Sequence, residues 1–108
     1  MPVDLLKYRQ LLIGGHSIRI VYVLTTTIVE LLKRSKEKTN NNEGGFWDPD
    51  TNTIYVASDT SRSNQCVILI HESLHAIEAM IGITFPERVI VQLSEYIYAF
   101  LKNNGIIK

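Results

Sequence analysis

The residues best suited to chemistry are the run His71-Glu72-Ser73-Leu74-His75, in which two histidines lie four positions apart with a glutamate between them. On a helix, this spacing places both imidazoles on one face, where the two rings can bind the same metal ion. Glu72 is then directed at a water molecule on that ion, where it can act as a general base. The motif predicts a zinc site with His71 and His75 as ligands and Glu72 as the catalytic residue.

The residues around the motif favour a helix from about Cys66 to Gly82. Apolar side chains recur at helical spacing and predict a stripe that faces the core; they are Val67, Ile70, Leu74, Ile77 and Ile81, with Leu69 and Met80 beside them. The opposite side carries the motif and Glu78. Because unpaired buried charge is costly, a bound metal would explain a polar strip on a mostly packed helix. The alternative is a solvated polar face without a function.

A catalytic zinc usually has three protein ligands and one open position, so a third ligand must be found. Glu95 is the first choice, because it follows His75 by twenty residues on the next predicted helix and has mainly apolar helical neighbours. Glu78 is the second choice, although on the same helix it could instead hydrogen-bond a ligand. Glu87 and Asp59 are weaker candidates. Four further side chains could stabilise an oxyanion; they are Tyr98, Tyr96, Tyr55 and His16.

The segments before the motif predict two hairpins separated by a helix. Residues 7–13 and 16–24 are β-rich and are joined by Gly14-Gly15, a short-hairpin signal. Thr27 and Glu30 match a capping box for a helix that reaches about Lys36, and a loop is expected over residues 38–45. Residues 46–48 and 53–57 predict the second hairpin. If the 53–57 strand lies at an edge of the sheet, it could pair with an extended peptide.

A final helix is expected from Pro86-Glu87 to about Asn103, since proline is well tolerated at the start of a helix. Its predicted core face consists of Val89, Leu93, Ile97 and Phe100. The order of elements is therefore β-β-α-β-β-α-α. This order predicts a small α+β fold, with an antiparallel or mixed sheet covered by helices, in a single domain over residues 1–108.

Composition limits the remaining possibilities. The chain has 45% hydrophobic and 20% charged residues, which is typical of a globular domain. Eleven basic and eleven acidic residues balance, so no nucleic-acid footprint is evident. Cys66 is the one cysteine, which suits a reducing cytoplasm and predicts a small core residue rather than a ligand. Neither a signal peptide nor a membrane-spanning segment is expected.

The motif helix, preceded by a hairpin and followed by a helix with Glu95, resembles the gluzincin type of zincin metallopeptidase. More closely, residues 14–104 resemble small phage-encoded metallopeptidases related in style to the ImmA/IrrE group, which are intracellular proteases that cut repressors of mobile elements. The similar segments are Asp48-Pro49, Thr53-Ile54-Tyr55-Val56, His71 to Glu78, and Leu93-Ser94 to Asn104.

This resemblance implies a zincin-like fold and Zn²⁺ held by His71 and His75, with Glu72 as the catalytic base. It further implies an intracellular metalloendopeptidase from a phage or another mobile element, with a protein or peptide substrate. The third ligand is not carried over, because relatives vary in the last helix. The alternative is a catalytically inactive metal-binding interaction protein that retains the zincin helix. A purely structural domain is the third possibility.

Overall fold

A mixed β-sheet forms one layer of the fold in the computed structural model, which describes residues 1–34 and 44–108. The described strands are β1 (Gln10–Ile13), β2 (His16–Val23), β3 (Gly45–Asp48) and β4 (Thr53–Ala57), in the order β1-β2-β4-β3. Both predicted hairpins are present, because β1 pairs antiparallel with β2 and β3 pairs antiparallel with β4. The pairing of β2 with β4 is parallel, which makes the sheet mixed.

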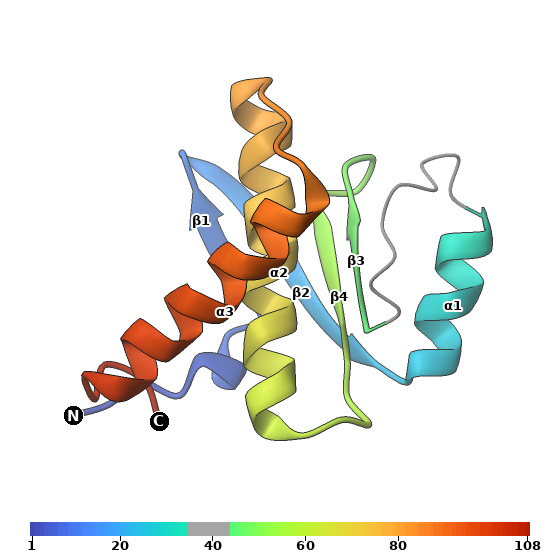
Figure 1. Ribbon diagram of the computed structural model, residues 1–108. Helices are drawn as coiled ribbons and strands as arrows, with labels where there is room; N and C mark the ends of the chain where they lie inside the picture. Colours follow the sequence, from blue (N-terminus) through green and yellow to red (C-terminus); the bar gives the residue numbers. More distant parts are fainter. Residues whose placement is uncertain (35–43) are drawn as a thin grey trace.

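Three α-helices accompany the described strands, after a short 3-10 helix at Leu5–Lys7. The helix α2 (Arg62–Ile81) packs on the sheet, and α3 (Glu87–Asn103) crosses α2 (Figure 1). In the same view, β3 and β4 lie between α2 and α1 (Thr25–Arg34) (Figure 1). The two ends of the chain lie close together, where Val3 pairs with Ile107. The chain therefore has the predicted α+β class and order of elements.

The core lies between the sheet and α2. It consists of alternate side chains of the two central strands and one face of the helix; they are Ile18, Ile20, Ile54, Val56, Ile68 and Leu69. The period of two along β2 is the reason that Ile18 and Ile20 share the covered face while Arg19 is exposed. The interior of the domain is thus built on one face of β2 and β4, and α2 covers that face.

Both ends of α2 have local signals that fix its length. The Ser61 side chain accepts a hydrogen bond from the Asn64 amide at the start of the helix. At the other end, Gly82 has a positive φ of 73°, a left-handed conformation that glycine adopts without steric cost. The Ser61 cap marks the start of α2. The conformation of Gly82 ends the helix shortly after the histidine motif and turns the chain back toward it.

The predicted core faces of the two long helices are wrong in part. On α2, Leu69 is buried as expected, but Ile77 and Ile81 of the expected stripe are exposed, while Ile68 and Ala76 are buried. On α3, Leu93 and Phe100 are exposed, and the buried positions are Ile90 and Ser94. The reason is tertiary: α2 is covered by the sheet on one side and by α3 on another, so some polar positions become buried and some apolar positions do not.

Three smaller expectations also change. The helix α1 begins at Thr25, whose amide and hydroxyl both donate to Asp59, so the capping box at Thr27 is not the start of the helix. The strand β4 is interior rather than at an edge, so its backbone is already paired on both sides and cannot add a peptide. The expected end of α1 at Lys36 and most of the 38–45 loop lie outside the described residues.

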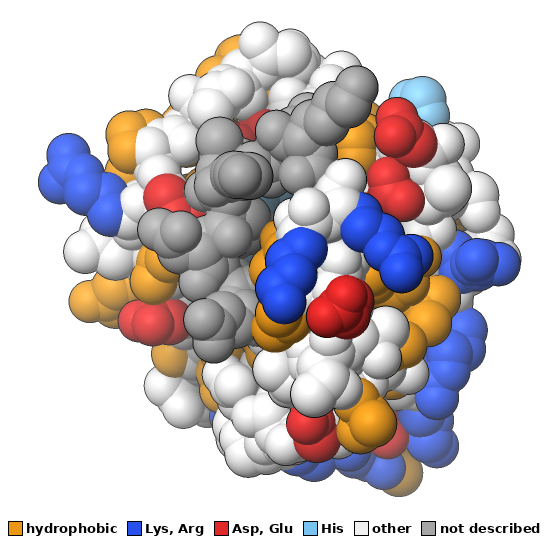
Figure 2. All heavy atoms as spheres, turned by 90° about the vertical axis from the view of Figure 1, so that its right-hand side faces the viewer, with side chains coloured by type: hydrophobic (Ala, Val, Ile, Leu, Met, Phe, Trp, Pro, Cys, Tyr) orange, Lys and Arg blue, Asp and Glu red, His pale blue; other side chains and the backbone are white. Residues whose placement is uncertain are grey.

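Both signs of charge are present on the surface of the described residues (Figure 2). On the face shown in Figure 2, acidic and basic side chains lie interspersed. Within residues 1–34 and 44–108, no helix combines the length and the apolar character that crossing a bilayer requires.

The burial of Cys66 gives the first prediction. Its side chain is buried on α2, and burial raises the pKa of the thiol, which disfavours the reactive thiolate. We expect a thiol reagent such as DTNB to leave the native protein unlabelled and to react fully after unfolding. In a Ser63→Cys variant, the added thiol lies at an exposed position of the same helix and should react in the native state. Rapid native labelling of the unmodified chain would contradict the burial of Cys66.

Candidate metal centre

Two turns of α2 bring His71 and His75 together, as the spacing of the motif predicts. The two rings meet edge to face with centroids 4.9 Å apart, and their Nε2 atoms are 3.2 Å apart. His71 is buried, with 4% of its surface exposed, and His75 is half-buried. Both histidines therefore present the same ring nitrogen to one point beside the helix.

The carboxylate of Glu87 reaches the same point from the first residue of α3. Its Oε1 lies 2.9 Å from the Nε2 of His71, and its Oε2 lies 3.2 Å from the Nε2 of His75. Among the described residues, His71, His75 and Glu87 form a group whose potential ligand atoms all lie within 4.8 Å of one another. Side chains from two different helices thus form one cluster that could hold a metal ion.

The separations within this cluster fit a tetrahedral ion. Zinc binds histidine nitrogen and carboxylate oxygen at about 2.0–2.2 Å, so neighbouring donor atoms in a tetrahedral site lie about 3.3 Å apart. The three contacts of the cluster, between 2.9 and 3.2 Å, are slightly shorter than this spacing, and the two contacts of Glu87 are made by different oxygens of its carboxylate. Two imidazoles and one carboxylate are also a donor set that catalytic zinc commonly uses, with one position left open.

Glu78 determines which nitrogen of His75 faces the cluster. Its Oε1 lies 2.6 Å from the Nδ1 of His75, and its Oε2 accepts a hydrogen bond of 2.5 Å from the Phe85 amide. Because Nδ1 donates to this carboxylate, the neutral ring of His75 carries a lone pair on Nε2. Glu78 is therefore a hydrogen-bonding partner of a candidate ligand, the second of the two roles that its place on α2 allows.

The protonation of His71 also suits metal binding. Burial lowers the pKa of its imidazole, and this effect outweighs the opposing attraction of the Glu87 carboxylate. A neutral His71 adds no positive charge at the point where both Nε2 atoms meet the Glu87 carboxylate. A cation, which is either a proton or a metal ion, would compensate the negative charge of this group.

Glu72 lies on the side of α2 that packs on β3. The side chain is fully buried, and a Cβ atom added at Gly45 would come within 2.9 Å of its Oε2 and 2.5 Å of Ile68 Cγ2. Glycine at position 45 therefore lets the β3 backbone approach the carboxylate closely. The expected catalytic base is thus held at the contact between α2 and the strand that follows the undescribed segment.

The other predicted site residues lie elsewhere. Glu95 is exposed rather than partly buried and lies eight residues beyond Glu87, about 12 Å further along α3 at the rise of a helix. It lines a cavity of about 260 Å³ together with His71 and Glu87, outside the cluster itself. Glu87, a weaker candidate in the sequence, occupies the place expected for Glu95. Asp59 instead caps α1 by accepting hydrogen bonds from Thr25.

The oxyanion candidates are not gathered at the cluster either. Tyr96 is 73% exposed, His16 is exposed beside the first hairpin turn, and Tyr55 stacks on Phe46. Tyr98 is half-buried on α3. None of the four lines either of the two cavities that adjoin the histidines.

The sequence did contain a signal for Glu87. Five residues separate the end of α2 from the start of α3, so the first residue of α3 must lie near the last turns of α2. An acidic side chain at the first turn of a helix is also favoured by the helix dipole. The short turn between α2 and α3 was therefore a better guide to the third member of the cluster than the apolar neighbours of Glu95.

No family model, curated protein or solved structure matches this chain.

Replacing the candidate ligands separates the two glutamates of α3. We expect Glu87→Gln to weaken zinc binding by at least about 100-fold, since loss of an outer partner alone costs about 10- to 100-fold. Glu95→Gln, an identical change on the same helix, should bind zinc as the unmodified chain does. Competition with a chromophoric chelator measures both affinities. The opposite order of effects would assign the third ligand to Glu95.

A separate prediction concerns Glu78. In Glu78→Gln the charge that orients and polarises His75 is lost while the size of the side chain is kept, so zinc affinity should fall by about 10- to 100-fold. The same chelator competition detects the change, and the melting temperature without metal reports any loss of the contact with Phe85. Unchanged zinc affinity would show that Glu78 only holds the turn.

Proposed function

We propose that this chain is a zinc-dependent hydrolase that cleaves peptide bonds, with His71, His75 and Glu87 as the metal ligands. The observation that carries the proposal is the convergence of three possible ligand groups, from His71, His75 and Glu87, at distances that suit zinc. The sequence resemblance to zincin metallopeptidases of the small phage-encoded type supports the same class. The zincin-like description of the fold is part of this proposal.

A zinc ion bound by these side chains would polarise a substrate carbonyl and lower the pKa of water. The chain contributes the remaining functions. Glu78 holds the Nδ1 proton of His75, so that Nε2 stays available to the metal. Glu72 accepts a proton on its carboxylate as water attacks the carbonyl carbon, and then delivers that proton to the leaving amine nitrogen.

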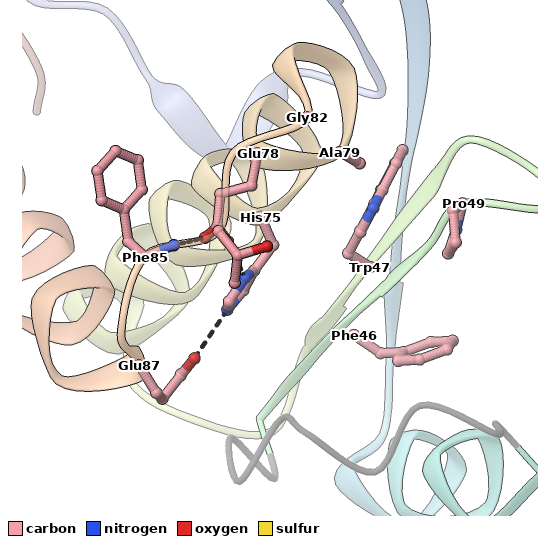
Figure 3. A pocket seen from close by; sticks show the side chains of 10 residues that line it. Phe46, Trp47, Pro49, His75, Glu78, Ala79, Gly82, Phe85 and Glu87 are labelled. Atoms are coloured by element: carbon pink, nitrogen blue, oxygen red, sulfur yellow. Dashed lines mark hydrogen bonds and ion pairs between the residues drawn. The ribbon is translucent and has the colours of Figure 1, made fainter.

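Access to the reacting atoms comes from a cavity that reaches the cluster. A space of about 630 Å³ adjoins His75 and Glu87 between α2 and β3 (Figure 3). In Figure 3, the Glu87 carboxylate points toward the ring of His75 at the inner end of this space. A substrate could therefore approach the metal from the β3 side without any change in the packing of α3 on α2.

A second function is favoured by one observation. Glu72 is fully buried, and its carboxylate lies against the backbone at Gly45, so it is shielded from bulk solvent. A chain with this arrangement that binds zinc and cleaves nothing would be a metal-binding interaction protein. The two functions differ in what Glu72 does, because only the hydrolase uses it as a base.

The Glu72→Gln variant tests the proposal. The zinc-loaded chain should hydrolyse members of a mixed fluorogenic peptide library, and Glu72→Gln should lower the rate by about 10²- to 10⁴-fold because the proton acceptor is lost. Metal analysis should find equal zinc in both proteins. Hydrolysis that survives in the fully loaded variant contradicts the role of Glu72. A loaded parent chain that cleaves no peptide supports metal binding without catalysis.

A further inference from the structure

Basic side chains gather at the end of the molecule where the first and last residues of the chain meet. In Figure 1, both ends of the chain, the 3-10 helix at Leu5–Lys7 and the last turns of α3 lie together. Five exposed cations come from these segments and from the neighbouring starts of β1 and α2. These residues, called the basic end from here on, are Lys7, Arg9, Arg62, Lys102 and Lys108. The balanced charge of the whole sequence does not reveal this grouping.

Asp4 is the carboxylate around which part of the basic end is arranged. Its side chain forms an ion pair with Arg62, and Lys7 follows it at the last position of the 3-10 helix. Desolvation raises the pKa of Asp4, but hydrogen bonds from Arg62 and Leu6 and the charges of Arg62 and Lys108 lower it more. Within the described part of the chain, no other carboxylate forms an ion pair with the basic end. One negative side chain therefore faces five positive ones.

Two side chains beneath the surface connect the remaining cations to the same place. Burial raises the pKa of the Cys66 thiol, and Arg62 and Lys102 are both close enough to oppose that effect by their charge. The Arg9 guanidinium lies 4.6 Å from the centroid of the Tyr22 ring, and Tyr22 in turn lies within electrostatic range of Cys66. The cations thus occupy one continuous region rather than separate faces.

Exposed apolar side chains come from the same segments as these cations. Val3 forms a β-bridge with Ile107, and Val3, Tyr8 and Ile106 are each between 41 and 44% exposed. A phosphate backbone offers an aliphatic side chain little, because it presents charge and hydrogen-bond acceptors. The boundary between headgroups and acyl chains in a lipid layer instead stabilises such a side chain. The aliphatic residues therefore favour a lipid surface over a nucleic acid as the partner.

The basic end is an outer surface rather than a pocket. None of its five residues lines either of the two cavities described above. Anionic headgroups attract lysine and arginine clusters, by about fivefold in affinity for each cation near the layer. Stable binding to a membrane usually combines such a cluster with apolar groups that enter the layer. The basic end and its apolar neighbours provide both.

We propose that the basic end docks this protein on an anionic lipid surface, with Val3, Tyr8 and Ile106 entering the boundary below the headgroups. The cations supply attraction that salt screens, and the apolar side chains supply contact that salt does not screen. Glu87 begins α3 and Lys102 lies near its end, so the helix separates the candidate metal site from the docked end by about 22 Å. The docking therefore does not depend on the proposed hydrolysis.

Co-sedimentation with lipid vesicles tests the proposal on the full chain, with and without zinc. Vesicles of equimolar phosphatidylserine and phosphatidylcholine should bind the protein at least about 100-fold more tightly than vesicles of phosphatidylcholine alone. High salt should weaken this binding, because exposed charges are screened. The result should be the same with and without zinc, since the candidate ligands lie outside the basic end. Equal binding to both kinds of vesicle overturns the proposal.

Two double variants locate the electrostatic contact. Lys102→Gln with Lys108→Gln should weaken binding to the phosphatidylserine vesicles by about 25-fold, since each cation contributes about fivefold. Lys33→Gln with Arg34→Gln removes the same charge from the exposed end of α1 and should leave binding nearly unchanged. Equal losses in the two double variants would show that net charge alone is responsible, which contradicts docking through the basic end.

A further pair of variants separates a lipid surface from a nucleic acid. Ile106→Asn should weaken vesicle binding by about 3- to 10-fold, because the inserted apolar area is lost. Ile83→Asn makes the same change at an exposed position of the turn after α2 and should bind as the unmodified chain does. Full binding by Ile106→Asn overturns the proposal. Displacement of the protein from vesicles by a single-stranded oligonucleotide at equal phosphate concentration also overturns it, and assigns the cations to nucleic acid.

Discussion

The short turn between α2 and α3 is the constraint on which the candidate metal site of His71, His75 and Glu87 depends. Gly82 ends α2 in a left-handed conformation, and Glu78 accepts a hydrogen bond from the Phe85 amide within the turn. These contacts hold the first residue of α3 over the last turns of α2, where the Glu87 carboxylate meets both histidines. Because Glu78 also contacts His75, one carboxylate links the turn to the orientation of a ligand.

The cluster in turn explains the burial pattern of α2. This helix is covered by the sheet on one side and by α3 on another, so His71, Glu72 and Glu78 are all buried. Buried polar groups are tolerated only when they have partners. His71 and Glu78 have partners within the cluster or the turn, and a cation would complete the compensation of the acceptor groups. The apolar side chains of the remaining face, such as Ile77 and Ile81, are exposed as a consequence.

A chain of this size forms its site from few elements. The helix α2 supplies both histidines and the candidate base, α3 supplies one carboxylate, and β3 forms the opposite wall with Trp47. Gly45 and Trp47 lie two positions apart on β3 and therefore face the same side of the sheet, one against Glu72 and the other lining the cavity. The position of this strand thus affects both the proposed base and the shape of the cavity.

The sequence by itself determined the features that depend on local spacing. The period of two predicted the hairpins, the end of α2 was expected at Gly82, and the four-residue spacing brought His71 and His75 together. Properties that depend on how the helices pack could not be obtained in this way. The buried faces of α2 and α3 and the choice of Glu87 over Glu95 follow from the angle at which α3 crosses α2. Sequence periodicity shows that a helix has an apolar side, but only the packed neighbours determine which side is covered.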